Sequence, residues 1–256
     1  MTPDPTSSAS SGVTDDTLLG GKVKFRQPAS GYRAAIDPVL LAAAVPAAVQ
    51  GRVLDLGCGA GAAMLCLARR REDLNVVGLE RDPATADLAR QNAAANGFGT
   101  RVSVVTGDIL NPPPQVMVGS FDAVMANPPH LETETATPSP VAAKAAATHE
   151  GEARIADWAR AAARFVRPQG VVLFVHRMDR LGELRAAVEQ AGCGGLVMCP
   201  LYPKVGAEPK RVILVARRGA KPDVQTANGL ILHEHDERFT AKASAILREG
   251  LSLTVV

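Results

Sequence analysis

A run of hydrogen-bond acceptors follows an apolar stretch near the middle of the chain. Residues 121–132 read FDAVMANPPHLE, so the apolar run ends in Asn127, Pro128, Pro129 and His130. Each proline fixes its own φ at about −65°, removes one backbone N–H and pushes the preceding residue into extended geometry. The turn is therefore stiff and rich in acceptors. A Pro-rich loop after a buried strand has the same composition, so this motif alone does not decide its chemistry.

A second segment has the glycine spacing of a ligand loop. VLDLGCGAGAAMLCLA (53–68) reads as strand, turn and helix, with Gly57, Gly59 and Gly61 spaced G-x-G-x-G. Such glycines let the backbone approach a ligand at the carboxyl end of the first strand, where open α/β sheets bind their ligands. The segment also satisfies G-x-G-x-x-A through Ala62, so a dinucleotide site stays open as an alternative.

Three acidic residues come at the ends of three successive apolar runs. Asp55 precedes the first glycine by two residues, where a carboxylate favours a cationic or amine-bearing ligand. Glu80 ends NVVGLE, where an acid can accept from both ribose hydroxyls of a nucleoside. Asp108 ends VVTGD and can accept from an adenine amino group, although a turn role explains it equally well. Asp82, followed by Pro83, is a better helix cap than Glu80. Asp55, Glu80 and Asp108 together predict a nucleoside site along one edge of the sheet.

An alternation of apolar runs and amphipathic stretches must position these residues. Strands are predicted at 52–56, 75–80, 102–107, 121–126, 170–176, 195–200 and 210–217, and helices at 60–71, 83–96, 155–166 and 180–191. Strands separated by helices form a parallel sheet covered on both faces. YPKVGAEP (202–209) joins the last two strands as a hairpin loop, which makes one closing strand antiparallel. The predicted fold class is therefore α/β, mostly parallel, with helices on both faces.

Composition predicts one soluble domain with extensions at both ends. The chain has 256 residues, of which 46% are apolar and 21% charged. Residues 1–16 are rich in Ser, Thr, Pro and Asp and are expected to form a disordered tail. The remaining predicted units are an N-terminal lid and helix segment (17–50), the main domain (51–218) and a C-terminal extension packed on that domain (219–256).

Several classes of protein are not indicated by the sequence. The longest apolar run, 38–49, is shorter than the roughly 20 residues that span a bilayer, and no signal pattern precedes it, so a cytoplasmic location is expected. The four cysteines form no C-x-x-C pair, and the histidines have no ligand spacing beyond H-x-H at 233–235. Neither a metal site nor a disulfide framework is therefore expected.

Basic residues gather in three parts of the chain, although the formal net charge of +2 is too small to identify a nucleic-acid partner. They are Lys22, Lys24, Arg26 and Arg33 before the fold, Arg177 and Arg180 after the fifth strand, and Lys204, Lys210, Arg211, Arg217, Arg218 and Lys221 around the closing hairpin. The first two groups are expected to flank the ligand edge of the sheet. Arg69, Arg70 and Arg71 close a helix, where a structural role is expected.

These motifs together resemble the class I S-adenosylmethionine-dependent methyltransferases over residues 50–217. VLDLGCGAG looks like the family's cofactor loop, LE its ribose-binding acid and GD its adenine-binding acid, and NPPH is similar to the N-P-P-[YF] signature of enzymes that methylate planar amines and amides. The resemblance implies a Rossmann-like, seven-stranded methyltransferase fold with S-adenosylmethionine as the cofactor. The cofactor-binding residues that it implies are Asp55, Gly57, Gly59, Gly61, Glu80, Asp108 and Asn127.

A finer resemblance covers most of the chain. LLGGKVKFRQPASGYRAAIDPVLLAA, ATPSP, ATHEGEARIADW and GLILHEHDERFTAKASAILREG are similar to segments of the bacterial tRNA adenine-N6 methyltransferases that act beside the anticodon of a valine tRNA. This implies a tRNA partner and a lid in which Asp37 is the expected helix N-cap, with Pro38 in the first turn. Together with the basic residues, the expected substrate-binding set is Tyr32, Arg33, Lys24, Arg26, Arg177 and His130.

The resemblance also implies a chemistry for the N-P-P turn. The lone pair of an adenine exocyclic amine is delocalised into the ring, so catalysis chiefly needs orientation of that amine beside the electrophilic methyl group. The Asn127 side-chain oxygen and the Pro128 carbonyl can each accept one N–H, and Pro129 stiffens the turn. His130 departs from the Tyr or Phe that normally stacks on the base, because imidazole has a smaller face and a charge that depends on pH.

Alternatives remain open from the sequence. A ribosomal RNA guanine-N2 methyltransferase or a protein glutamine methyltransferase would share the N-P-P motif with a different acceptor. A nicotinamide-dependent oxidoreductase would explain the glycines but not the prolines, and His130 also allows an inactive RNA-binding module.

Overall fold

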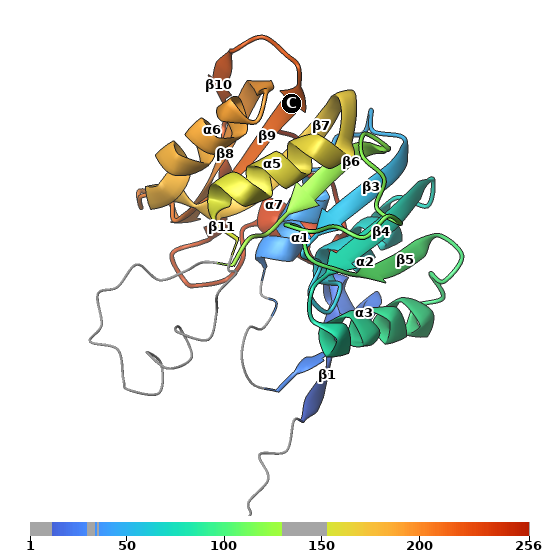
Figure 1. The fold of residues 1–256 in the computed structure, drawn as a ribbon. Helices are drawn as coiled ribbons and strands as arrows, with labels where there is room; N and C mark the ends of the chain where they lie inside the picture. Colours follow the sequence, from blue (N-terminus) through green and yellow to red (C-terminus); the bar gives the residue numbers. More distant parts are fainter. Residues whose placement is uncertain (1–11, 30–33, 35, 130–152, 256) are drawn as a thin grey trace, which may run out of the picture.

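The computed structural model describes residues 12–29, 34, 36–129 and 153–255, which build one large mixed sheet with helices on both sides (Figure 1). The seven predicted strands are confirmed as β3 (Gly51–Leu56), β4 (Leu74–Glu80), β5 (Val102–Thr106), β6 (Phe121–Ala126), β7 (Val166–Arg177), β8 (Cys193–Lys204) and β9 (Arg211–Arg218). The sheet carries two further short strands, β10 (Val224–Thr226) and β11 (Leu230–His233), which both pair with β8. These two were missed because each is too short to show a clear alternation of apolar and polar residues.

The order of strands creates the crevice in which open α/β sheets bind their ligands. The order is β10-β8-β9-β7-β6-β3-β4-β5, with β11 also beside β8. From β3 the chain first adds β4 and β5 on one side and then returns to place β6 on the other. The order therefore reverses between β3 and β6, and ligands of such sheets bind outside the carboxyl ends of the strands at that point.

The closing hairpin is antiparallel as the sequence predicts. β9 runs antiparallel to both β7 and β8, while the other pairings in this sheet are parallel. β8 extends to Lys204, so the connecting loop is shorter than the predicted segment 202–209. Arg211 pairs with Arg177 and Arg217 with Val171 in the β7–β9 register. The start of β9 therefore lies at the carboxyl edge of the parallel strands, and its end lies at the opposite edge.

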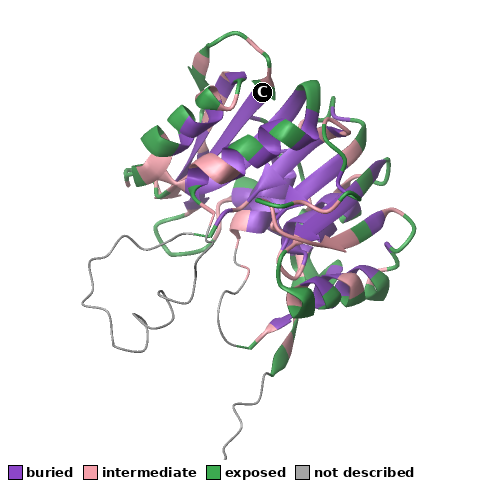
Figure 2. Cartoon of the chain, in the orientation of Figure 1, coloured by how far each residue is buried: buried purple, intermediate pink, exposed green. Residues whose placement is uncertain are grey.

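Two apolar cores separate the helices into two layers. The helices are α1 (Asp37–Ala43), α2 (Ala62–Arg70), α3 (Pro83–Ala95), α5 (Ile155–Phe165), α6 (Leu181–Gln190) and α7 (Ala241–Ser244), with single turns η1 (Leu19–Gly21), η2 (Met178–Arg180) and η3 (Ala245–Glu249). α1, α2 and the C-terminal elements share one core, and α5 and α6 share the other. Figure 2 shows the central strands buried between the layers and the outward helix faces exposed.

The expected disordered tail is wrong for its last residues. Val13–Leu18 forms β1, which pairs with β2 (Val23–Pro28) in an antiparallel hairpin that crosses the predicted boundary at residue 16. The segment has few apolar side chains, but backbone pairing and polar contacts replace them: Asp16 accepts from Thr14 Oγ1 at 2.8 Å and from Gln27 Nε2 at 2.9 Å. Residues 1–11 lie outside the described residues.

The C-terminal segment packs on the rest of the protein. Leu230, Ile246 and Leu253 are buried in the core shared with α1 and α2. The Arg70 side chain donates to the Gly250 carbonyl at 2.8 Å and to the Ser252 hydroxyl at 2.9 Å. The structural role expected for this arginine is thereby confirmed. The boundaries at residues 51 and 218 stay predictions.

Candidate functional site

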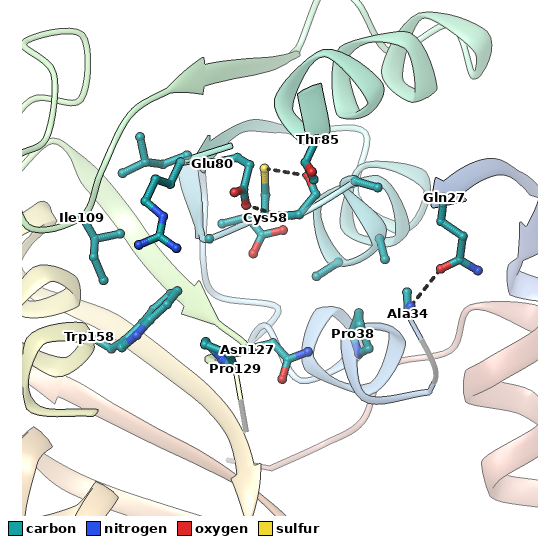
Figure 3. Close-up of a pocket in the computed structure, with 18 of the residues that line it drawn as sticks. Gln27, Ala34, Pro38, Cys58, Glu80, Thr85, Ile109, Asn127, Pro129 and Trp158 are labelled. Carbon is teal, nitrogen blue, oxygen red and sulfur yellow. Dashed lines mark hydrogen bonds between the residues drawn. The ribbon is translucent and has the colours of Figure 1, made fainter. Parts of the chain in front are cut away.

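A cavity of about 550 Å³ lies at the carboxyl edge, over the point where the strand order reverses. Its walls come from β2, the loops after β3, β4, β5 and β6, and helix α5. Figure 3 shows Ile109 and Trp158 on one side of it, Gln27 and Ala34 on the other, and Glu80 facing Asn127 and Pro129 across it. The predicted residues on its walls are Asp55, Gly57, Gly59, Glu80, Asp108, Asn127 and Pro129.

The glycine loop between β3 and α2 brings the backbone to the cavity. Gly57 and Gly59 have φ of +70° and +55°, a conformation that L side chains rarely adopt. A Cβ on Gly57 would lie 2.4 Å from the Trp158 ring, whereas a Cβ on Gly59 would meet nothing within 4 Å. Gly57 therefore lets α5 approach β3, and Gly59 leaves open space for a ligand. Gly61 is the N-cap of α2.

Glu80 ties the loop to the end of β4. One of its carboxylate oxygens accepts from the Gly59 N–H at 2.9 Å, and the other accepts from the Asp82 N–H at 2.9 Å. Asp82 itself caps α3 by accepting from the Thr85 N–H at 2.7 Å, as the sequence predicts. Because a carboxylate has about four acceptor sites, Glu80 keeps capacity for donors from a ligand in the cavity.

Asp55 is a buried acid at the base of the cavity. Its side chain is 2% exposed and accepts from the Met64 N–H at 3.0 Å. The pKa of Asp55 is raised to about 7, chiefly by burial; the Met64 N–H opposes this rise, and the negative charge of Glu80 adds to it. Removal from water disfavours the charged form, and a cation in the cavity would favour it again. The position therefore suits a ligand that carries a positive charge.

The N-P-P turn follows β6 directly and forms the opposite wall. Asn127 and Pro129 line the large cavity, and Pro128 and Pro129 line a smaller cavity of about 180 Å³ beside it. Trp158, from α5, lines both cavities. Asp108 lines the large cavity and accepts from the Leu110 N–H at 2.9 Å, which is the turn role weighed from the sequence. Asp108 therefore both stabilises a turn and lines the cavity.

The β1–β2 hairpin, whose second strand belongs to the segment predicted as a lid (17–50), supplies a further wall of the cavity. Phe25, Gln27 and Pro28 line the cavity, whereas Lys24 and Arg26 alternate onto the exposed face of β2. The Gln27 side chain accepts from the Ala34 N–H at 2.9 Å, as Figure 3 shows, and so holds the start of the segment before α1. Tyr32 and Arg33 lie outside the described residues, as does His130.

The expectation that Asp37 caps α1 is wrong. The N-cap is Ile36, and Asp37 is the first residue of the helix, followed by Pro38. The Asp37 carboxylate instead pairs with Arg211 of β9 at 3.0 Å. This ion pair joins α1 to the closing hairpin, which sequence spacing cannot show because 174 residues separate the partners.

The predicted basic groups divide between the two sheet edges. Arg177 and Arg211 face each other across β7 and β9 at the carboxyl edge, whereas Arg217 lies at the opposite edge. Arg177 pairs with Asp179, and Arg26 pairs with Asp15 at 3.2 Å. Local acids therefore reduce the positive charge of the two groups that were expected to flank the ligand.

Trp158 is one of the cavity residues that sequence reasoning did not identify as a site residue. It is the single tryptophan of the chain and is 8% exposed. Its ring contacts the glycine loop and lies between the two cavities. The available signal was its rarity in a chain with only 4% aromatic residues.

The described part of the chain contains neither a metal-binding group of side chains nor a membrane-spanning helix. Within residues 12–29, 34, 36–129 and 153–255, no group of three His, Cys, Asp or Glu side chains is arranged to hold a metal ion. No helix in the described part of the chain is long and apolar enough to cross a bilayer.

Comparison with known proteins identifies relatives with this arrangement. A family model described as the methyltransferase small domain matches residues 34–152. The chain is 32% identical to a tRNA1(Val) (adenine(37)-N6)-methyltransferase of Porphyromonas gingivalis, over 73% of this chain and 75% of the relative. It is 30% identical to the protein of that name from Aeromonas salmonicida, over 72% and 75%.

A solved methyltransferase structure has the same fold. The crystal structure of a predicted O-methyltransferase from Agrobacterium tumefaciens is 25% identical, with a TM-score of 0.71, and the match covers 85% of this chain and 98% of that one. The methyltransferase fold expected from the sequence is thus confirmed. The chain belongs to the tRNA1(Val) (adenine(37)-N6)-methyltransferase family.

Proposed function

We propose that this chain transfers the methyl group of S-adenosylmethionine to the exocyclic amine of an adenine in tRNA, next to the anticodon. One observation carries the proposal: the N-P-P turn and the acids Asp55 and Glu80 line a single cavity at the point where the strand order reverses. The relatives' names give the acceptor as adenine 37 of a valine tRNA. An enzyme that acts on tRNA works in the cytoplasm, which is the location expected from the sequence.

The residues of the cavity fit S-adenosylmethionine. Glu80 has acceptor capacity for ribose hydroxyls, and Ile109 and Trp158 provide apolar surface for a planar ring. Asp55 offers a buried carboxylate to the cationic end of the molecule. The open space at Gly59 lets a ligand contact the backbone directly. When bound, the cofactor supplies an electrophilic methyl group on a sulfonium.

The N-P-P turn supplies the acceptor side of the reaction. The Asn127 side-chain oxygen and the Pro128 carbonyl each accept one N–H of the amine, which directs its lone pair towards the methyl group. The N–C bond forms as the C–S bond breaks, and one proton leaves the amine for solvent. Asn127 is neutral and takes up no proton. Its role is orientation, and the prolines hold it in place because they remove backbone freedom.

An aromatic surface for the acceptor base can come from two residues. His130 occupies the position where relatives of this motif carry Tyr or Phe. Trp158 lines the cavity that holds Pro128 and Pro129 and belongs to the large cavity as well. Stacking on an aromatic ring contributes roughly 1–3 kcal/mol per base. Trp158 therefore compensates for the smaller imidazole face.

The decisive experiment offers different acceptors to the same enzyme. The purified protein is incubated with labelled S-adenosylmethionine and, separately, with tRNA, ribosomal RNA or a protein mixture, and the digested nucleosides are identified by mass. We expect N6-methyladenosine in tRNA alone, with binding to tRNA that weakens steeply as salt increases because phosphate contacts dominate RNA affinity.

Other outcomes would contradict the proposal at defined points. Methylated guanosine in ribosomal RNA or methylated glutamine in protein would overturn the acceptor while sparing the cofactor. Preferential binding of NAD would overturn the cofactor. Tight tRNA binding with no product from any pool would identify an RNA-binding protein without activity.

A further inference from the structure

Asn92 of α3 and Asn96, the C-cap of that helix, pair with the outer edge of the β1–β2 hairpin. Asn92 accepts from the Arg26 N–H at 2.9 Å and donates to the Arg26 carbonyl at 2.8 Å. Asn96 accepts from the Lys24 N–H at 2.8 Å and donates to the Lys24 carbonyl at 2.7 Å. Each side-chain amide therefore replaces one residue of a neighbouring strand.

The spacing of the two asparagines matches the strand they bind. Four residues of a helix rise about 6 Å, and two residues of a strand advance about 6.8 Å. The pairs Asn92–Arg26 and Asn96–Lys24 can therefore form side by side. Asparagine is an unfavourable residue inside a helix, so Asn92 indicates a purpose other than helix formation, whereas Asn96 is the C-cap of α3.

Asn92 makes one contact that Asn96 lacks. Its Nδ2 also donates to the carbonyl of Ala60 at 2.9 Å, and its side chain is 1% exposed. Ala60 belongs to the glycine loop and lines the large cavity. Phe25 and Gln27, on either side of Arg26, line the same cavity. One buried amide thus joins two walls of the cavity that are far apart in sequence.

We propose that Asn92 is a positioning residue for the cofactor, because its amide holds the hairpin wall and the glycine-loop wall at a fixed separation. This inference rests on the proposed function, since the ligand between the walls is taken to be S-adenosylmethionine. Asn92 touches the backbone of both walls and acts through them. Its loss leaves the N-P-P turn untouched, so it changes the binding of the cofactor and not the transfer step.

The matched pair Asn92→Ala and Asn96→Ala tests this idea, because both variants remove a hairpin contact and one alone removes the link to Ala60. We expect Asn92→Ala to weaken S-adenosylmethionine binding, measured by calorimetry, by about tenfold or more, and Asn96→Ala by less than about threefold. Turnover on tRNA at saturating cofactor should fall by less than about threefold in both variants, so that KM for the cofactor changes and kcat does not.

Amide hydrogen exchange in the ligand-free protein provides a readout that does not depend on the cofactor. Asn92→Ala should speed exchange in both β2 and the glycine loop, whereas Asn96→Ala should speed it in β2 alone. Asn92→Ser repeats both measurements with a smaller polar side chain if the alanine variant does not fold.

Equal losses of affinity in the two alanine variants, or unchanged loop exchange in Asn92→Ala, would overturn the positioning role. If wild type itself fails to bind S-adenosylmethionine, the proposed function is wrong, and the exchange pattern alone then decides whether Asn92 joins the two walls.

Discussion

The two facing walls of the large cavity differ in charge and in how they are held. The wall built by β3 and β4 presents the acids Asp55 and Glu80, and backbone N–H groups hold both carboxylates. The wall after β6 presents the neutral Asn127 in a turn stiffened by two prolines. Charge on the first wall favours tight binding of a cation, and stiffness on the second favours orientation of an amine. Binding and turnover should therefore be separable by mutation.

The largest effect is expected from Asn127→Ala on turnover. Loss of the side-chain oxygen removes one of two acceptors that orient the amine, and a lost hydrogen bond to a reacting group reduces kcat by about 10²- to 10³-fold. Cofactor affinity should change by less than about twofold, because the acids on the other wall remain. Steady-state methylation of tRNA and calorimetry with S-adenosylhomocysteine give the two numbers. Near wild-type turnover would show that Asn127 merely ends a strand.

The reverse pattern is expected for Glu80→Ala. This carboxylate provides charge-assisted hydrogen bonds worth about 1.5–3 kcal/mol, so cofactor affinity should fall by roughly 10- to 150-fold. Glu80→Gln is the matched control, because its amide oxygen can still accept from the Gly59 or the Asp82 N–H. This variant should therefore lose less cofactor affinity than Glu80→Ala. Binding is measured by calorimetry. Unchanged affinity in the alanine variant would remove Glu80 from the cofactor site.

The buried acid of the first wall should also make the ligand-free protein sensitive to pH. The folded Asp55 carboxyl keeps its proton up to about pH 7, whereas the unfolded one releases it near 3.8. Between these values the folded state binds more protons, so this group stabilises the fold at low pH and its contribution is lost as pH rises, by at most about 1.4 kcal/mol per pH unit.

Asp55→Asn isolates this contribution because an amide does not titrate. The difference in unfolding free energy between wild type and variant, from urea denaturation at pH 4 to 8, should move in favour of the variant as pH rises. A difference that stays constant with pH would show that Asp55 ionises normally in the folded protein.

The smallest effect is expected from Trp158, which lines both the large and the small cavity. Trp158→Phe removes part of a ring that lines both cavities, and about 40 Å² of lost apolar contact costs about 1 kcal/mol, or roughly fivefold in cofactor affinity. Turnover should fall by a similar factor, whereas Asn127→Ala changes mainly turnover and Glu80→Ala mainly cofactor affinity. Since Trp158 is the single tryptophan, its fluorescence in wild type reports cofactor binding directly. Fluorescence that does not respond to a saturating cofactor would place the ring away from the ligand.

Local patterns account for the part of the fold that was predicted. β3 to β9 were found because apolar runs of five or more residues alternate with helical stretches, and β6 was predicted with its observed bounds, Phe121–Ala126. The residues that follow these strands were therefore placed at one edge, and the family's motifs supplied their roles. A parallel sheet carries its functional residues at strand ends, so finding the strands finds much of the site.

Contacts between distant segments account for what was missed. β1 is polar and owes its structure to pairing with β2, a partner whose edge is in turn held by α3. Asp37 was expected to cap its own helix, but a charged partner on β9 outweighs that local preference. Trp158 reaches the cavity because Gly57 has no side chain to block its ring. Each of these depends on a packing partner that sequence spacing does not reveal.

The two short strands beside β8 have a consequence for how the protein behaves at high concentration. An uncovered edge strand offers unpaired N–H and C=O groups to the edge of another molecule and is a starting point for aggregation. β10 pairs with residues 196–198 of β8 and β11 with residues 201–204, so the two lie end to end along a strand of 12 residues. Pro200, which has no N–H to offer, lies between the two paired stretches. The C-terminal segment thereby keeps the long outer strand from recruiting a second sheet.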